Sequence, residues 1–255
     1  MPKHFNTTGP VIADEHYCID PMRRIDWEDV QFLIQTKKFF VLHAPRQTGK
    51  TSTLLAMVDA LMASGGYTAL YMNVESAQTA RHNVESGMTT ILGSLIDAAT
   101  YRLNDTRLQA WRTELWQQHG AHGAMKALLS RWAQANDKPI VLMIDEVDAL
   151  VGDTLISLLR QLREGYISRP STPFIHSVIL CGVRDVRDYR IHTAHQEIIT
   201  GGSAFNVKAK SLMMGHLTPE QIEALYAQHT AATGQAFDAA IFPELWMTPK
   251  ASLGW

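Results

Sequence analysis

The chain has 255 residues, 46% hydrophobic and 19% charged, a composition typical of a folded domain and not of a disordered or fibrous protein. Its 23 Lys and Arg nearly balance its 25 Asp and Glu, which excludes a polybasic nucleic-acid coat. Residues 1–10 lack the apolar core of a secretory signal, and every apolar run is far shorter than the ~20 residues that cross a bilayer. We therefore expect a cytoplasmic protein with no membrane partner.

Five short apolar runs alternate with longer stretches of helical periodicity. The runs are residues 39–43, 68–74, 140–144, 177–181 and 205–209. Strands that are apolar on successive residues are typical of a parallel sheet covered on both faces, whereas the last run alternates and suits an edge. The pattern predicts an α/β three-layer sandwich around a mainly parallel, five-stranded sheet.

Helical periodicity fills the segments between these strands. Apolar residues over 54–62 predict a helix that stops at Gly65-Gly66. Residues 87–135 predict three helices, with breaks near 104–105 and 120–123. Further helices are expected around 155–162 and over 219–232, the latter with Thr218 as N-cap and Pro219 at its first position.

The clearest motif follows the first strand directly and opens the first helix. It fits a phosphate-binding loop, in which backbone N–H groups surround an anion, Lys50 supplies positive charge to the β- and γ-phosphates, and the Thr51 hydroxyl binds Mg²⁺. Ala44 replaces the usual first glycine. The expected nucleotide-binding residues are Ala44, Pro45, Arg46, Gln47, Thr48, Gly49, Lys50, Thr51 and Ser52.

Two adjacent carboxylates end the apolar run at 140–144. The carboxyl end of a strand is where open α/β sheets place ligands. We expect Asp145 to hold Mg²⁺ together with Thr51, and Glu146 to polarise the water that attacks the γ-phosphate. Glu146 and Lys50 are thus the first candidates for catalytic residues.

A third strand ends in Cys181-Gly182-Val183-Arg184, and Arg184 is our candidate sensor of the γ-phosphate. Ion pairing with a nearby carboxylate is the alternative role for this arginine. Arg187 and Arg190 follow at intervals of three, which would align them on one helix face as candidates for an arginine acting in trans.

With these motifs, the chain resembles AAA+/STAND P-loop ATPases, most closely uncharacterised bacterial AAA-like ATP-binding proteins that carry HAPRQTGKT, VLMIDE and CGVRDVRDYR. The resemblance covers roughly residues 16–242. It implies that ATP and Mg²⁺ are bound and that the sensor strand lies between the phosphate-loop strand and the Asp-Glu strand. It also implies an adenine-side segment before the first strand, loosely matched by residues 17–21 with Arg23 and Arg24.

The resemblance also suggests a domain organisation. Residues 1–215 would form the ATPase domain, including the adenine-side segment, and 216–242 the start of a helical lid. Family members continue with a Gly-x-Pro motif that is missing here, so 243–255 is expected to be a divergent, mobile tail.

The leading hypothesis is a Mg²⁺-dependent ATP-binding protein that hydrolyses ATP slowly and acts as a nucleotide switch. Arg184 would distinguish ATP from ADP. The helices after the sensor strand would pass the nucleotide state to an unknown protein partner. One alternative is a ring-forming or DNA-associated AAA+ ATPase with nucleotide-dependent self-association. Another is a nonenzymatic interaction module whose truncated lid has impaired nucleotide binding.

Overall fold

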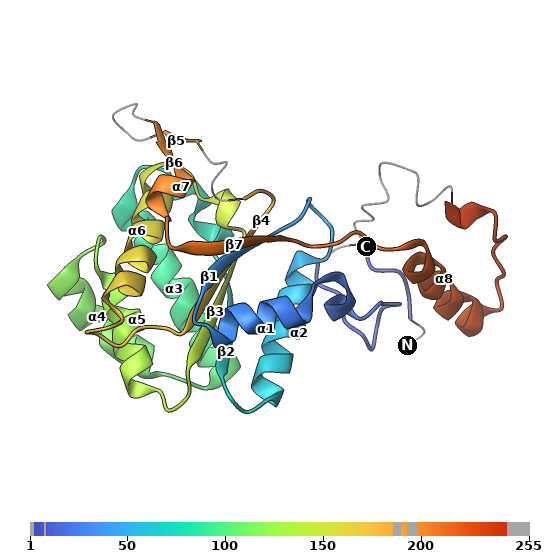
Figure 1. The fold of residues 1–255 in the computed structure, drawn as a ribbon, viewed down its shortest axis with the longest axis horizontal. Coiled ribbons are helices and arrows are strands. Elements are labelled where there is room, and N and C mark those ends of the chain that lie inside the picture. Colours follow the sequence, from blue (N-terminus) through green and yellow to red (C-terminus); the bar gives the residue numbers. More distant parts are fainter. Residues whose placement is uncertain (1–2, 8, 186–189, 193–197, 244–255) are drawn as a thin grey trace.

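The structure is a computed structural model that describes residues 3–7, 9–185, 190–192 and 198–243. Its central sheet contains five parallel strands in the order β2-β3-β4-β1-β7 (Figure 1). These strands are β1 (Phe39–His43), β2 (Thr68–Asn73), β3 (Ile140–Asp145), β4 (Ser177–Gly182) and β7 (Lys208–Met213). The expected α/β fold is confirmed, as is the place of the sensor strand β4 between β1 and β3.

Helices cover both faces of this sheet. One face packs against α1 (Trp27–Gln35) and α2 (Lys50–Ala63), and the other against α3 (Val84–Leu103), α4 (Arg107–His119), α5 (Ala124–Ala135) and α6 (Gly152–Ser168). Alternate strand residues serve the two cores, so Phe39 and Val41 face α3–α6 while Phe40 and Leu42 face α1 and α2. This arrangement is the predicted three-layer sandwich.

Helix ends follow from local sequence. After α2, Gly65 adopts a left-handed conformation with φ of 72°, as its position after the helix requires. The three helices expected between 87 and 135 are α3, α4 and α5, and Asn104 ends α3 in the left-handed region. The last helix, α8 (Pro219–Thr233), starts with a capping box between Thr218 and Gln221.

Helix α1 was not predicted, although its sequence carries a start signal. The Asp26 side chain accepts a 3.1 Å hydrogen bond from the Asp29 backbone N–H and thereby caps the helix. Val30, Leu33 and Ile34 then recur at helical spacing and are buried against the sheet.

The predicted bounds of the last strand were wrong. Phe205 is buried, but it precedes the strand and stacks on Phe39 with ring centroids 6.2 Å apart. The strand itself, β7, starts at Lys208 and consists largely of half-buried and exposed residues. Its predicted position at the edge of the sheet is confirmed.

Between β4 and β7 the structure has a small antiparallel hairpin, β5 (Arg190–His192) with β6 (Ile198–Thr200), and the one-turn α7 (Gly201–Ala204). The expectation that Arg190 lies on a helix is therefore wrong, because its backbone is extended. Arg187 and residues 244–255 of the expected tail lie outside the described residues.

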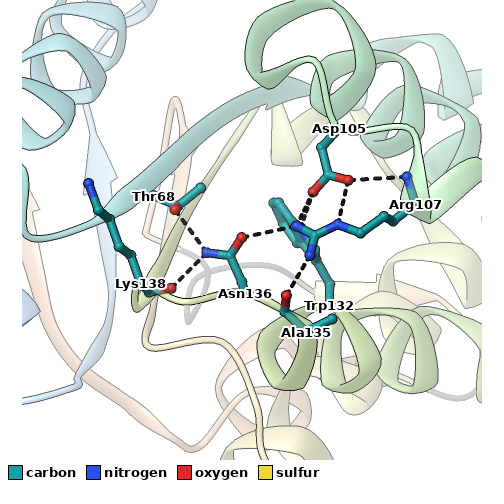
Figure 2. A network of polar contacts seen from close by, with 7 residues as sticks. All are labelled: Thr68, Asp105, Arg107, Trp132, Ala135, Asn136 and Lys138. Atoms are coloured by element: carbon teal, nitrogen blue, oxygen red, sulfur yellow. Dashed lines mark hydrogen bonds and ion pairs between the residues drawn. The ribbon is translucent and has the colours of Figure 1, made fainter.

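A polar network joins the start of α4 to the end of α5 (Figure 2). Asp105 accepts hydrogen bonds from Arg107 Nε at 2.8 Å and from the indole Nε1 of Trp132 at 2.9 Å. Arg107 also donates to Asn136, whose amide in turn donates to Thr68 at the start of β2. The network ties the helical layer to the strand and satisfies the polar atom of the buried Trp132.

The N-terminal segment lies beside α8, which forms one end of the molecule (Figure 1). The Phe5 ring lies 5.0 Å from Tyr17, 5.3 Å from Tyr226 and 5.3 Å from His229, centroid to centroid. The Gln228 side chain exchanges two hydrogen bonds with the backbone of Cys18. Segments from the two ends of the described chain therefore depend on each other for packing.

Candidate nucleotide-binding site

The loop between β1 and α2 has the backbone geometry of an anion-binding turn. Gln47 and Gly49 adopt positive φ values of 58° and 81°, which fold the chain tightly before α2 begins. The backbone N–H groups of residues 49–52 have no hydrogen-bond acceptor in the part of the chain that the structure describes. These unpaired donors at a helix N-terminus suit an oxyanion.

Lys50 is folded back over this loop. Its side chain is buried, and the Nζ atom donates to the Pro45 carbonyl at 3.0 Å and the Ala44 carbonyl at 3.3 Å. Thr48 is also buried and donates to Pro45 at 2.7 Å. The loop therefore already holds a cation at its centre, which is paired with neutral carbonyls and, among the described residues, with no carboxylate.

Asp145 lies directly beneath the start of α2. It is completely buried, and its Oδ2 atom accepts hydrogen bonds from the Thr51 hydroxyl at 2.7 Å and the Tyr71 hydroxyl at 3.1 Å. Burial raises the pKa of the Tyr71 hydroxyl, and the Asp145 charge raises it further. Tyr71 thus remains protonated and donates its hydrogen bond to Asp145.

Glu146 follows Asp145 but occupies the left-handed region, with φ of 58°. A side-chain-bearing residue rarely adopts this conformation, so the turn after β3 stores strain. Partial burial raises the pKa of Glu146 above its ordinary value, and the nearby charges of Asp145 and Asp148 add to the effect. A carboxylate with weakened solvation is better suited to accept a proton from water.

The turn after β3 also contacts the end of β4. The Asp148 side chain accepts a 3.1 Å hydrogen bond from the backbone N–H of Val183, the residue before Arg184. Arg184 itself is exposed and does not line the cavity described next. The structure therefore links the Asp-Glu turn to the sensor strand through Asp148, without placing the Arg184 side chain at the loop.

An open cavity, here called the loop cavity, lies over the start of α2. Seven of the predicted site residues line it together, namely Gln47, Thr48, Gly49, Lys50, Thr51, Ser52 and Glu146. Six further lining residues were not predicted. Three of them, Tyr71, Asn73 and Glu75, lie at or just after the carboxyl end of β2, and this position beside β3 is a signal that could have found them. The other three are Thr7, Gly9 and Pro10.

A second, more apolar cavity, here called the side cavity, lies on the other side of the loop. It is bordered by the loop at Thr48 and Gly49, by α8 at Leu225, and by the N-terminal segment. The N-terminal lining residues are Val11, Tyr17, Cys18, Ile19, Pro21 and Arg24. Arg23, in contrast, is exposed and does not line this cavity.

Thr51 and Asp145 present oxygen atoms, the ligand type that Mg²⁺ prefers. Mg²⁺ sites in nucleotide-binding proteins use one or two protein oxygens, with phosphate oxygens and water completing the shell. Among the described residues no group of three or more His, Cys, Asp or Glu could hold a metal ion alone. The donor set therefore fits Mg²⁺ bound together with a nucleotide.

None of the helices in the described ranges is long and apolar enough to cross a membrane. Cys18 and the buried Cys181 are both free thiols.

Comparison with solved structures shows the same fold. A Walker-type ATPase of Pyrococcus abyssi aligns with a TM-score of 0.59 at 10% identity, covering 98% of this chain and 68% of its own. The ORC1 protein of Aeropyrum pernix, solved in complex with DNA, aligns with a TM-score of 0.50 at 14% identity over 83% of this chain and 48% of its own. The chain thus spans about half the length of that ORC1 protein. At these identities the likeness concerns the fold alone.

Among curated proteins no sequence matches. The family model described as "AAA domain" matches residues 33–189, which is more than half of the chain and includes the loop, Asp145, Glu146 and Arg184. Together with the parallel sheet and the phosphate-loop geometry, this match shows that the chain belongs to the AAA domain family of P-loop ATPases.

Proposed function

We propose that this protein binds ATP with Mg²⁺, hydrolyses it slowly and acts as a nucleotide-dependent switch. The observation that carries the proposal is the convergence of Lys50, Thr51 and Glu146 on one cavity, directly above the buried Asp145. A plain strand-to-helix turn would not need a buried lysine held over unpaired N–H groups.

The binding step follows from the loop. The N–H groups of residues 49–52 would donate to the phosphates, and Lys50 would exchange the carbonyls of Ala44 and Pro45 for phosphate oxygens. The Thr51 hydroxyl and Asp145 would hold Mg²⁺, which neutralises charge on the β- and γ-phosphates. We propose that the loop residues from Ala44 to Ser52 bind the nucleotide, as the sequence predicted.

Glu146 would orient the water that attacks the γ-phosphate and accept its proton. Its raised pKa makes the carboxylate a stronger base than an exposed glutamate. Slow turnover is proposed because Arg184 lies outside the loop cavity and must move to reach a phosphate. In this scheme Arg184 distinguishes ATP from ADP, and α8 with the N-terminal segment reports the difference to a partner.

The side cavity is the proposed location of the adenine ring. Its apolar lining from Tyr17, Ile19 and Leu225 suits a flat aromatic base, and it adjoins the loop at Thr48 and Gly49. Under this proposal residues 1–215 form the ATPase domain and 216–242, which include α8, begin a lid over the base.

The first experiment is Mg²⁺-dependent ATP binding followed by single-turnover hydrolysis, with Lys50→Ala and Glu146→Gln in parallel. We expect the wild type to bind and hydrolyse ATP, Lys50→Ala to bind poorly, and Glu146→Gln to bind without turnover. Binding without any turnover in the wild type would favour a nonenzymatic interaction module. Absence of nucleotide binding by folded wild-type protein would refute the proposal.

A further inference from the structure

Arg24 connects three segments that are far apart in the sequence. It is the last residue of the short 3₁₀ helix Pro21–Arg24. Its Nη1 atom donates to the Thr48 carbonyl in the loop, and its Nε and Nη2 atoms donate to the Gly215 carbonyl at 3.1 and 2.6 Å. The Gly215 N–H returns a 2.9 Å bond to the Arg24 carbonyl. The guanidinium makes no carboxylate ion pair within the described ranges.

The contact with Thr48 has a consequence for the neighbouring N–H group. In a trans peptide the C=O and N–H point in opposite directions, and the described chain has no cis peptide bond. Because Arg24 holds the Thr48 carbonyl on the side-cavity face of the loop, the Gly49 N–H must point away from Arg24. That N–H is one of the unpaired donors at the loop cavity, which Gly49 also lines.

The positive charge also affects the strength of this donor. A cation on a carbonyl oxygen polarises the peptide group and makes its N–H a better donor to an anion. Arginine suits the position because its planar fork binds two carbonyls at once, which a single ammonium group does less well. A Cβ at Gly49 would lie 3.2 Å from Arg24 Nη1, so glycine lets the guanidinium approach closely.

The second carbonyl, that of Gly215, belongs to the segment between β7 and α8. This segment is held on other sides too, because the Met214 N–H donates to His43 at 3.0 Å and the Thr53 hydroxyl donates to the Met214 sulfur at 3.3 Å. Thr218, the N-cap of α8, lies three residues after Gly215. Arg24 therefore links the Thr48–Gly49 peptide to the segment that leads into α8.

We propose that Arg24 is a positioning residue that aims the Gly49 N–H at a nucleotide phosphate and couples the loop to the segment entering α8. The inference rests on the proposed nucleotide binding and deepens it, since it names the contact through which a nucleotide bound at the loop would affect α8. Arg24 itself need not touch the nucleotide.

The test compares Arg24→Ala with Arg23→Ala, which removes the same charge from the neighbouring exposed residue. Affinities for Mg²⁺–ATP and ADP are measured by titration calorimetry on the full chain. We expect Arg24→Ala to weaken binding about 10-fold to 100-fold, Arg24→Lys to be intermediate, and Arg23→Ala to stay within about twofold of the wild type.

A second measurement separates coupling from simple damage to the fold. Hydrogen exchange of the peptide covering residues 213–218 is recorded with and without saturating ATP. We expect ATP to change its protection in the wild type and in Arg23→Ala, and to leave it unchanged in Arg24→Ala even at saturation.

The outcomes are distinct. Failure of the wild type to bind ATP refutes the proposed function. Binding by the wild type with equal affinity in Arg24→Ala refutes only the role of Arg24. The same holds if ATP changes the protection of residues 213–218 in saturated Arg24→Ala as much as it does in the wild type. If Arg24→Ala does not fold, Arg24→Lys is compared with Arg23→Lys, and equal affinities of these two variants overturn the inference.

Discussion

Thr51 and Asp145 are 94 residues apart in sequence, yet the Thr51 hydroxyl donates a 2.7 Å hydrogen bond to the Asp145 carboxylate. The bond joins the first turn of α2, the helix that follows β1, to the end of β3, and β4 lies between β1 and β3 in the sheet. In this state the two proposed Mg²⁺ ligands are hydrogen-bonded to each other. A hydroxyl that donates its hydrogen keeps two lone pairs, so Thr51 can offer its oxygen to Mg²⁺ while this bond holds that oxygen in place.

This relationship predicts different behaviour for two substitutions of Thr51. Thr51→Ser keeps the hydroxyl and should keep Mg²⁺-dependent ATP binding within about threefold of the wild type. Thr51→Ala removes one metal ligand and should lose most of the increase in ATP affinity that Mg²⁺ provides, about tenfold or more. Titrations with Mg²⁺ and with EDTA measure this increase, and an equal Mg²⁺ effect in both variants would contradict the assignment.

Glu146→Gln should have opposite effects on activity and stability. Turnover should fall by about 100-fold or more because the base is lost, while ATP affinity changes little. The same variant should unfold at a higher temperature, because the raised pKa shows that the fold disfavours the Glu146 charge near Asp145 and Asp148. Differential scanning calorimetry at neutral pH measures the second effect. A lower unfolding temperature would show that Glu146 stabilises the turn.

Arg184→Ala should narrow the ratio of ATP to ADP affinities, since ATP alone carries the γ-phosphate that Arg184 is proposed to contact. The exposed position of Arg184 means that its side chain must be drawn inward when ATP binds. Titration calorimetry with both nucleotides gives the ratio. An unchanged ratio of the ATP and ADP affinities would show that Arg184 is not the γ-phosphate sensor.

Two glycines of the same helix offer a paired test of the packing between α3 and α6. A Cβ at Gly87 would collide with the Thr154 side chain, whereas a Cβ at Gly93 would meet no atom within 4 Å. Gly87→Ala should therefore destabilise the protein by about 1–3 kcal/mol, and Gly93→Ala should stabilise it by about 0.5–1 kcal/mol. Urea denaturation measures both. Equal effects of the two substitutions would contradict the close approach of the helices.

The network in Figure 2 predicts a pH dependence of stability. The hydrogen bond from Arg107 holds the pKa of Asp105 below its ordinary value. The unfolded chain thus takes up a proton more readily than the fold does. The contribution of Asp105 is complete well above the unfolded carboxyl pKa of about 3.9 and is lost as the pH falls through the folded pKa.

Asp105→Asn should accordingly lower the free energy of unfolding at neutral pH, and its difference from the wild type should shrink below about pH 4. Asp97→Asn, which removes an exposed carboxylate from α3, is the control for the loss of one negative charge. Urea denaturation at several pH values measures the difference. A difference that does not vary with pH would assign the effect to packing alone.

Much of the fold was predictable because buried parallel strands carry continuous apolar runs. β1, β3 and β4 were recognised for this reason, and the order of β1, β4 and β3 followed from the family resemblance. β7 lacks such a run because one edge and much of its surface are exposed, so the buried Phe205 before it gave a misleading signal. Burial alone does not identify a strand.

The candidate site likewise contains residues that the sequence predicted and residues that it did not. Residues contiguous in the loop and at the end of β3 were predictable because their chemistry is local. Tyr71 and Glu75 were not, because their approach to the loop depends on the register of β2 against β3, in which Asn73 pairs with Asp145. The double contact of Arg24 depends on folding that brings Gly215 beside Thr48, which no local pattern reports.

The pairing of Cys18 with Gln228, 210 residues later, has a consequence for how the protein forms during synthesis. A chain made from its N-terminus onward exposes Phe5 and Tyr17 long before Tyr226 and His229 of α8 are available to cover their rings. The sheet and the phosphate loop can assemble earlier, because their strands end at Met213. The side cavity is thus completed last, and a ribosome-bound chain that ends before α8 would carry the loop without the apolar wall beside it.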